Sequence, residues 1–288
     1  MKRFVLGLVA ATAMTVSAFA QEEIKPGLLF DLGGKFDKSF NEASFNGAEK
    51  FKTETGIEYV DFEISNDAQR EQALRRFAED GRNPIVMTGF SWAESLDKVA
   101  TDFPDTKFAI IDMVVDKPNV RSVVYKEHEG SYVVGVMAAM ASTSKKVGFV
   151  GGMDIPLIRK FGCGYVGGAK AAGGTGVGVL QAAADAGKLG IGVDSNQNGL
   201  QPGKVLTSML KRVDVAVYNA FNDAKDGKFT PGVNNLGLAE GGVDYAMDDN
   251  NKDLVTEEMK AAVEKAKADI IAGTIQVHDF RSDNACPY

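Results

Sequence analysis

The chain has 288 residues, of which 44% are hydrophobic and 25% are charged, and its formal net charge at pH 7 is −7. An acidic protein is repelled by nucleic acid and by anionic membranes, so the charge argues against either as a partner. The length is too great for one small hydrophobic core, which favours two domains.

Residues 1–20 have the order of a secretory signal peptide. Lys2 and Arg3 precede an uncharged, mostly apolar run that ends in small residues before Gln21. The run is short for a membrane span, and no cysteine follows it as a lipid attachment point. We therefore predict an exported chain that starts near Gln21. Removal of Lys2 and Arg3 changes its formal charge from −7 to −9.

The segment from Asp31 to Asn41 joins an apolar run, residues 27–30, to a predicted helix. Ser39 and Glu42 have the Ser-x-x-Glu spacing of a capping box, so the order is strand, glycine turn, helix. In an open α/β sheet, ligands bind at such junctions. Two acids, a phenylalanine and an asparagine suit a flat, uncharged, hydroxylated ligand better than a phosphate. The alternative is an ordinary capped helix.

Apolar, β-branched runs then alternate with helical stretches along most of the chain. This alternation indicates βα units, and so a mainly parallel sheet with helices on both faces. An antiparallel strand pair is also predicted around residues 241–242. The predicted strands are 57–62, 84–88, 108–112, 120–125, 147–150 and 190–194, and the predicted helices are 67–80, 91–103, 132–141, 157–172, 177–186, 211–226 and 256–272.

Three predicted strands end in an aspartate, namely Asp31, Asp112 and Asp194. If the sheets that carry them face one another, these acids point toward a common crevice. Each acid taken alone could equally be the N-cap of the following helix.

The alternation breaks between Ala172 and Gly173. Two predicted helices follow one another there, with only a glycine cluster, residues 173–178, between them. A strand and its crossover are unaccounted for, and a βαβ unit takes ~30 residues or more. Either the chain forms a helical hairpin or a segment is absent. The cluster lacks the GxGxxG spacing, so no dinucleotide cofactor is predicted.

A secreted serine hydrolase is the enzyme alternative. Residues 89–93 come close to the GxSxG nucleophile elbow around Ser91, but the second glycine is missing. Only His278 has the chain position of a catalytic histidine. Ser91 is also well placed as a helix cap, and nothing else in the sequence assembles an activated nucleophile.

Cys163 and Cys286 are the two cysteines of the chain. In an exported protein thiols tend to pair, so one disulfide that ties the C-terminal tail to a helix is one interpretation. Two unpaired buried thiols are the other. His128 and His278 are far apart and have no ligand spacing around either cysteine, so no zinc site is predicted.

Three motifs in order closely resemble the basic membrane protein family of ABC transporter substrate-binding proteins. They are Asp31 to Asn41, residues 151–161, and residues 190–197 with 205–211. The chain is similar to bacterial purine nucleoside receptors over nearly all of its mature length. The resemblance implies a periplasmic, monomeric type I periplasmic-binding fold, with two doubly wound α/β lobes joined by three crossover segments. Lobe one would hold residues 21–125 and 205–238, and lobe two residues 126–204 and 239–288.

Family members carry a strand–helix–strand segment between the counterparts of Ala172 and Gly173, and this chain lacks it. The resemblance otherwise implies a purine nucleoside or base as ligand, an ABC permease as partner, and neither cofactor nor catalysis. It also assigns roles. Asp31 and Asn41 would hydrogen-bond the ligand, Phe40 would stack on the purine, Asp112 and Lys211 would make polar contacts, Asp194 would accept ribose hydroxyls, and Gly174 would complete the set.

Overall fold

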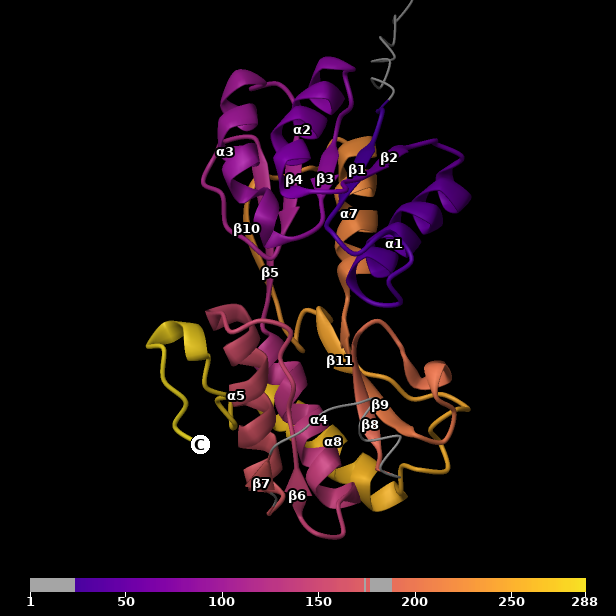
Figure 1. Ribbon diagram of the computed structural model, residues 1–288, viewed down its shortest axis with the longest axis vertical. Helices are drawn as coiled ribbons and strands as arrows, with labels where there is room; N and C mark the ends of the chain where they lie inside the picture. The colour runs from indigo at the N-terminus through magenta and orange to yellow at the C-terminus, as the bar shows by residue number, and fades with distance from the viewer. Residues whose placement is uncertain (1–23, 174, 177–187) are drawn as a thin grey trace, which may run out of the picture.

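The computed structural model describes residues 24–173, 175–176 and 188–288. There the chain forms two α/β lobes stacked along the long axis of the molecule (Figure 1), which confirms the predicted fold class. The predicted signal peptide lies outside the described residues. Among the helices that are described, none combines the length and the apolar character needed to cross a bilayer. Of the described residues, lobe one comprises 24–125 and 213–236, and lobe two comprises 127–173, 175–176, 188–211 and 243–288.

Lobe one is built on a six-stranded sheet in the order β10-β5-β4-β3-β1-β2, in which every strand pair is parallel. Parallel neighbours need crossover connections. Helices supply them between the first four strands along the chain, whereas the loop 112–119 connects Phe108–Ile111 to Val120–Tyr125. The strands are β1 (Gly27–Phe30), β2 (Val60–Glu63), β3 (Ile85–Met87), β4 (Phe108–Ile111), β5 (Val120–Tyr125) and β10 (Gly232–Leu236), and the helices are α1 (Phe40–Thr55), α2 (Arg70–Glu79), α3 (Ala93–Asp102) and α7 (Val213–Lys225).

Helices cover both faces of this sheet. Successive strand residues point to opposite faces, so Leu28 packs in the core beneath α1 and α7, while Leu29 packs beneath α2 and α3. A strand buried on both faces needs apolar side chains throughout. This explains why the central strands β1, β3 and β4 appear in the sequence as continuous apolar runs, whereas the edge strands β2 and β10 are more exposed and carry polar residues.

Lobe two has less sheet. It contains a three-stranded sheet, β11-β9-β8, and a separate two-stranded pair, β6-β7. No described strand joins the two sheets, as expected if a strand is missing between them. The predicted helix at 177–186 falls outside the described residues. The elements are α4 (Glu127–Ala141), β6 (Lys146–Val147), α5 (Pro156–Ala171), β7 (Thr175–Gly176), β8 (Gly190–Asp194), β9 (Val205–Lys211), β11 (Val243–Tyr245) and α8 (Glu257–Ile271).

The crossing from lobe two back to lobe one lies after β9. Strand β9 pairs with β8 and β11, so residues 205–211 belong to lobe two, which corrects the predicted boundary at residue 205. The predicted antiparallel pair around residues 241–242 is also corrected. The strands on either side, β10 and β11, lie in different sheets, because the chain crosses between lobes there. The antiparallel partner of β11 is β9.

Three short segments, around residue 126, around residue 212 and at residues 237–242, connect the lobes and lie side by side. The backbone N–H of Lys126 donates to the carbonyl of Leu236 at 2.9 Å, and that of Arg212 donates to the carbonyl of Gly242 at 2.8 Å. The hydroxyl of Tyr125 donates to the carbonyl of Arg212 at 3.2 Å. These bonds tie each connecting segment to a neighbour.

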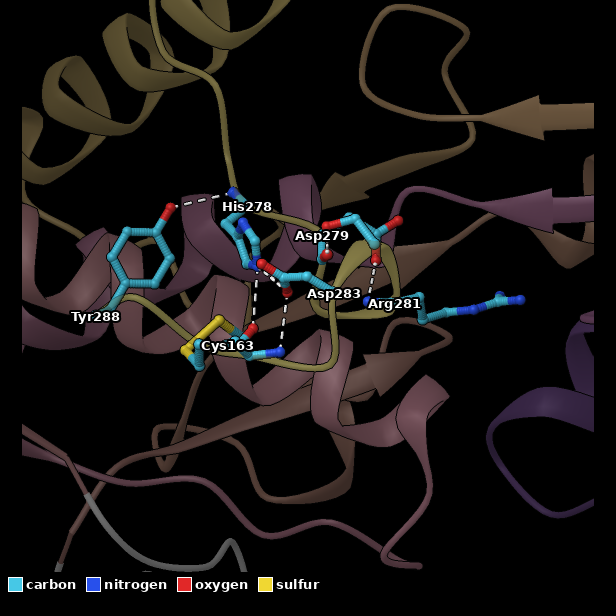
Figure 2. Close-up of a disulfide and its surroundings, with 9 residues drawn as sticks. Cys163, His278, Asp279, Arg281, Asp283 and Tyr288 are labelled. Carbon is cyan, nitrogen blue, oxygen red and sulfur yellow. Dashed lines mark hydrogen bonds and ion pairs between the residues drawn. A yellow bond between two sulfur atoms is a disulfide. The ribbon is translucent and has the colours of Figure 1, made fainter.

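The C-terminal tail follows α8 and lies against α5 (Figure 2). Cys163 of α5 and Cys286 of the tail form a disulfide with their Cα atoms 5.6 Å apart. The backbone N–H of His278 donates to the hydroxyl of Tyr288 at 3.1 Å. Of the two arrangements that the sequence left open for the cysteines, the structure contains the disulfide.

Candidate functional site

A cavity of about 990 Å³ lies between the lobes. Five residues predicted for the ligand site line it, three from lobe one and two from lobe two. The wall from lobe two is largely apolar and comes from α4, α5, the segment 142–152 that contains β6, and strands β8 and β9. The predicted residues that line the cavity are Asp31, Phe40, Asp112, Asp194 and Lys211.

Asn41 has a different place from the one predicted. Its side chain is only 1% exposed. Its Nδ2 donates to the carbonyls of Asp31 and Gly34, each at 3.1 Å, and its Oδ1 accepts from the Asp31 backbone N–H at 3.1 Å. Asn41 therefore shapes the loop after β1, with both the nitrogen and the oxygen of its amide bonded to that loop.

Asp31 is oriented by Arg70 of α2. Oδ1 of Asp31 accepts from Nη2 of Arg70 at 2.6 Å and from the Leu32 backbone N–H at 2.8 Å. Arg70 also pairs with Asp67 at 2.8 Å, and its guanidinium lies 5.1 Å from the Trp92 ring. The partly buried carboxylate thus has a fixed direction at the cavity rim.

Lys211 lies where the two lobes meet. Its Nζ is 2.6 Å from Oδ1 of Asp112, at the end of β4, and 3.2 Å from Oε1 of Glu127, at the start of α4. Burial opposes the charge on Lys211, but Asp112 and Glu127 more than offset it and raise the pKa of the ammonium above its ordinary value. Lys211 is therefore a permanent cation.

Burial raises the pKa of Asp112 to about 6; Lys211 counteracts the increase and Glu127 adds to it. The residue also has φ of 74°, in the left-handed region that aspartate tolerates better than most side chains. A buried carboxylate that titrates near neutral pH is typical of a functional site.

Asp194 ends β8 on the opposite wall, with φ of 65°. Its Oδ2 accepts a hydrogen bond from the Ser39 hydroxyl at 2.8 Å. Burial raises the pKa of this carboxyl group, against the effects of Lys211 and Ser39. The predicted capping box does not form, because the Ser39 hydroxyl makes this contact with lobe two and Asp37 accepts from the N–H groups of Asn41 and Glu42 at the start of α1. The contact brings Ser39 of lobe one to the strand end of lobe two, so the lobes are closed on this side.

Phe40 offers an aromatic face at the cavity. Nζ of Lys211 lies 5.2 Å from the centre of its ring, and comparable distances join this ammonium to Tyr125 (5.1 Å) and Phe161 (5.6 Å). The predicted Gly174 lies outside the described residues.

The sequence reasoning missed Glu127 and Lys160. Oε2 of Glu127 is 2.9 Å from Nζ of Lys160, and both side chains are buried. One signal could have found Glu127, which follows strand β5 closely, as Asp31, Asp112 and Asp194 follow or end theirs. Nothing in the local sequence marks Lys160.

The hydrolase alternative gains no support. Ser91 lies in a short 3₁₀ turn, Phe90–Trp92, and within the described chain its hydroxyl bonds to no histidine or carboxylate. His128 belongs to α4, and His278 pairs with Asp283 in the tail at 3.0 Å. The described residues also contain no cluster of three potential metal ligands.

A family model described as ABC transporter substrate-binding protein PnrA-like matches residues 24–173 and 169–280. The chain belongs to this family. It is 33% identical to an uncharacterized lipoprotein of Pyrococcus furiosus, over 78% of this chain and 70% of that protein. It is 30% identical to the ABC transporter nucleoside-binding protein BmpA of Lactococcus lactis, over 92% of each chain. A solute-binding protein of an ABC transporter from Aeropyrum pernix has a similar structure, with a TM-score of 0.77 and 27% identity over 89% of this chain and 93% of that one.

The comparisons also bear on the break at Ala172 and Gly173. The two segments matched by the family model meet at residues 169–173. The alignment with the Lactococcus protein has 327 positions, whereas 92% of this 288-residue chain is about 265 residues, so about 60 positions have no counterpart here. A segment present in the relatives is thus absent from this substrate-binding protein, as the interrupted alternation predicts.

Proposed function

We propose that this protein is the periplasmic receptor of an ABC importer and that it binds a purine nucleoside or a related base between its lobes. The observation that carries the proposal is that Asp31, Phe40, Asp112, Asp194 and Lys211 line one cavity. Its membrane permease partner follows from the family, and the nucleoside from this side-chain set together with the nucleoside-binding relative.

The charges support a neutral ligand with several hydrogen-bond donors. Three carboxylates, Asp31, Asp112 and Asp194, and three lysines, Lys146, Lys188 and Lys211, line the cavity, so the lining has no net positive charge to attract a phosphate. Ribose hydroxyls and base N–H groups can donate to these carboxylates instead. We assign Phe40 to stacking on the base, because such stacking is worth ~1–3 kcal/mol and tolerates different bases.

The opposite walls have different tasks in this proposal. Asp112 and Lys211 contact the base or the sugar, and Asp31 makes a further polar contact from its fixed direction. Asp194 accepts from the ribose hydroxyls. We assign Asn41, whose amide is bonded to the backbone of Asp31, to holding the loop that carries Asp31.

Thermal unfolding with added ligands tests the function. We expect adenosine, guanosine or inosine to raise the unfolding temperature, since ligand at 1,000 times Kd adds ~4 kcal/mol to stability. Ribose and a nucleoside monophosphate are the controls and should give no comparable shift. A folded protein that responds to no purine would contradict the proposal and would identify a receptor that has lost binding with the missing segment.

A further inference from the structure

A buried series of alternating charges leads from the cavity to the C-terminal tail. Nζ of Lys211 lies 2.6 Å from Asp112 and 3.2 Å from Oε1 of Glu127. Oε2 of Glu127 lies 2.9 Å from Nζ of Lys160, which is also 3.5 Å from Oδ2 of Asp279. Only Asp112 and Lys211 are among the described residues that line the cavity.

Glu127 and Lys160 are almost completely buried, at 1% and 3% exposure. A buried charge is costly unless it is paired, and removing one partner leaves the other uncompensated. Glu127 shares its two oxygens between Lys211 and Lys160. The position of the cavity ammonium therefore depends on a cation that the ligand does not touch.

Close helix packing fixes this arrangement. A Cβ atom at Gly164 of α5 would lie 2.3 Å from the carbonyl oxygen of His128 in α4, so only glycine allows the two helices to approach this closely. Lys160 lies one turn before Gly164, and Glu127 immediately precedes His128. Lys160 also donates to the carbonyl of Tyr125 at 2.6 Å, which attaches it to the first segment between the lobes.

The tail covers Lys160 from the outside. Cys163, three residues after Lys160 on α5, is bonded to Cys286, and Asp279 lies in the same tail (Figure 2). Burial, with a contribution from Lys160, lowers the pKa of His128 to about 4, so this neighbour is uncharged at neutral pH. The other charged groups that act on the cluster are Lys126 and Asp194.

We propose that Glu127 and Lys160 are positioning residues of the ligand site, which hold the Lys211 ammonium against Asp112 and so set the hydrogen bonds that the ligand meets. The inference rests on the proposed nucleoside function. With Lys160 neutralised, the whole charge of Glu127 acts on Lys211 and draws it away from Asp112. Within the buried cluster of Asp112, Lys211, Glu127 and Lys160, the two carboxylates then also have one cation fewer.

Substitution of Lys160 tests this inference in the full-length mature protein. We expect Lys160→Met to raise the Kd of inosine roughly tenfold, and to move the loss of affinity at low pH to a higher pH, because a cluster with fewer cations takes up its first proton sooner. Lys160→Arg keeps the charge and should stay within about threefold of the unmodified protein. Lys170→Met, exposed on the same helix, is the matched control. An unchanged Kd and pH profile in Lys160→Met would overturn the inference.

A second measurement needs no ligand. Carboxyl ¹³C titration of protein labelled at Asp follows the proton taken up by Asp112, which should occur at higher pH in Lys160→Met than in Lys160→Arg. If Lys160→Met does not fold, Asp279→Asn replaces it, since Asn keeps the helix cap and removes a negative charge beside Lys160. That variant should shift the titration to lower pH, and no shift in either variant refutes the role. If the unmodified protein binds no purine, the proposed nucleoside function is wrong. The titration, which needs no ligand, still tests whether Lys160 positions Lys211.

Discussion

The hydroxyl of Ser39 in lobe one donates to Oδ2 of Asp194 in lobe two at 2.8 Å and lies 3.3 Å from the carbonyl of Val193. Two further hydrogen bonds are donated in the opposite direction, from side chains of lobe two to backbone carbonyls of lobe one. The Ser195 hydroxyl donates to the carbonyl of Ser39 at 2.7 Å, and Nε2 of Gln197 donates to the carbonyl of Lys38 at 3.0 Å. The segment from Asp31 to Asn41 therefore both lines the cavity and takes part in the closure between the lobes.

The closure predicts the effect of Ser39→Ala. The variant loses the hydroxyl that donates to Asp194, and such a bond is worth ~0.5–1.5 kcal/mol, while the backbone carbonyl of residue 39 can still accept from Ser195. We expect the Kd of inosine, measured by calorimetry, to rise about three- to tenfold. Ser65→Ala, in an exposed loop of the same lobe, should leave it unchanged. Equal affinities for both variants would show that these contacts do not stabilise the bound form.

Stacking predicts a loss that does not depend on the base. Phe40→Ala should weaken inosine and hypoxanthine alike by ~1–3 kcal/mol, because the ring contacts the part that both ligands share. Phe36→Ala is the matched control, since Phe36 belongs to the same loop and is 63% exposed. If Phe40→Ala weakens only the nucleoside, Phe40 contacts the sugar and not the base.

Asp194 should distinguish the nucleoside from the base. We expect Asp194→Ala to weaken inosine more than hypoxanthine, because only the nucleoside has ribose hydroxyls to donate to this carboxylate. Asp249→Ala, at an exposed position of the same lobe, should affect neither. Competition calorimetry with the two ligands measures the difference. Equal losses for inosine and hypoxanthine would remove the ribose role from Asp194.

The pKa of Asp112, raised to about 6, predicts weaker binding in acid. If the ligand requires the carboxylate, the fraction of competent protein falls below this pH, and the Kd of inosine should be roughly tenfold higher at pH 5 than at pH 7.5. Asp112→Asn should flatten the profile, and we expect Asp194, whose pKa is also raised, to contribute to any slope that remains. Identical slopes in both proteins would show that Asp112 does not control binding.

The stability of the fold is expected to depend on pH in the opposite sense to the affinity for the ligand. The folded state binds the Asp112 proton more tightly than the unfolded state does. The contribution of Asp112 to stability is therefore complete below its ordinary pKa and is lost as the pH rises through about 6. Denaturant unfolding without ligand at pH 5 and 7.5 separates the two effects.

The disulfide predicts a stability difference. Cys163 and Cys286 are 123 residues apart, and loss of a native disulfide typically costs 2–5 kcal/mol. The double variant Cys163→Ser, Cys286→Ser should therefore unfold at a lower urea concentration than the oxidised protein. A reducing agent should destabilise the unmodified protein and leave the double variant unaffected. Equal stabilities of the oxidised and double-variant proteins would contradict a structural role.

The sequence by itself determined the alternation of strands and helices, the acids Asp31, Asp112 and Asp194 at the ends of strands, and the break at Ala172. These are local features, since burial on both faces demands apolar runs and a βα turn delivers its side chains to one edge of a sheet. Phe40 and Lys211 were identified through motifs that resemble those of the family.

Only the tertiary structure decided which of these groups remains available to a ligand. Asn41 looked like a ligand contact, but its amide is used by the loop after β1. Residues 205–211 joined the other lobe because β9 pairs with β8. Glu127 and Lys160 acquire a role only when α4 and α5 pack together and bring their charges to Lys211. The physical reason is that a polar side chain acts through the partners that reach it, and those partners come from segments far apart in the chain.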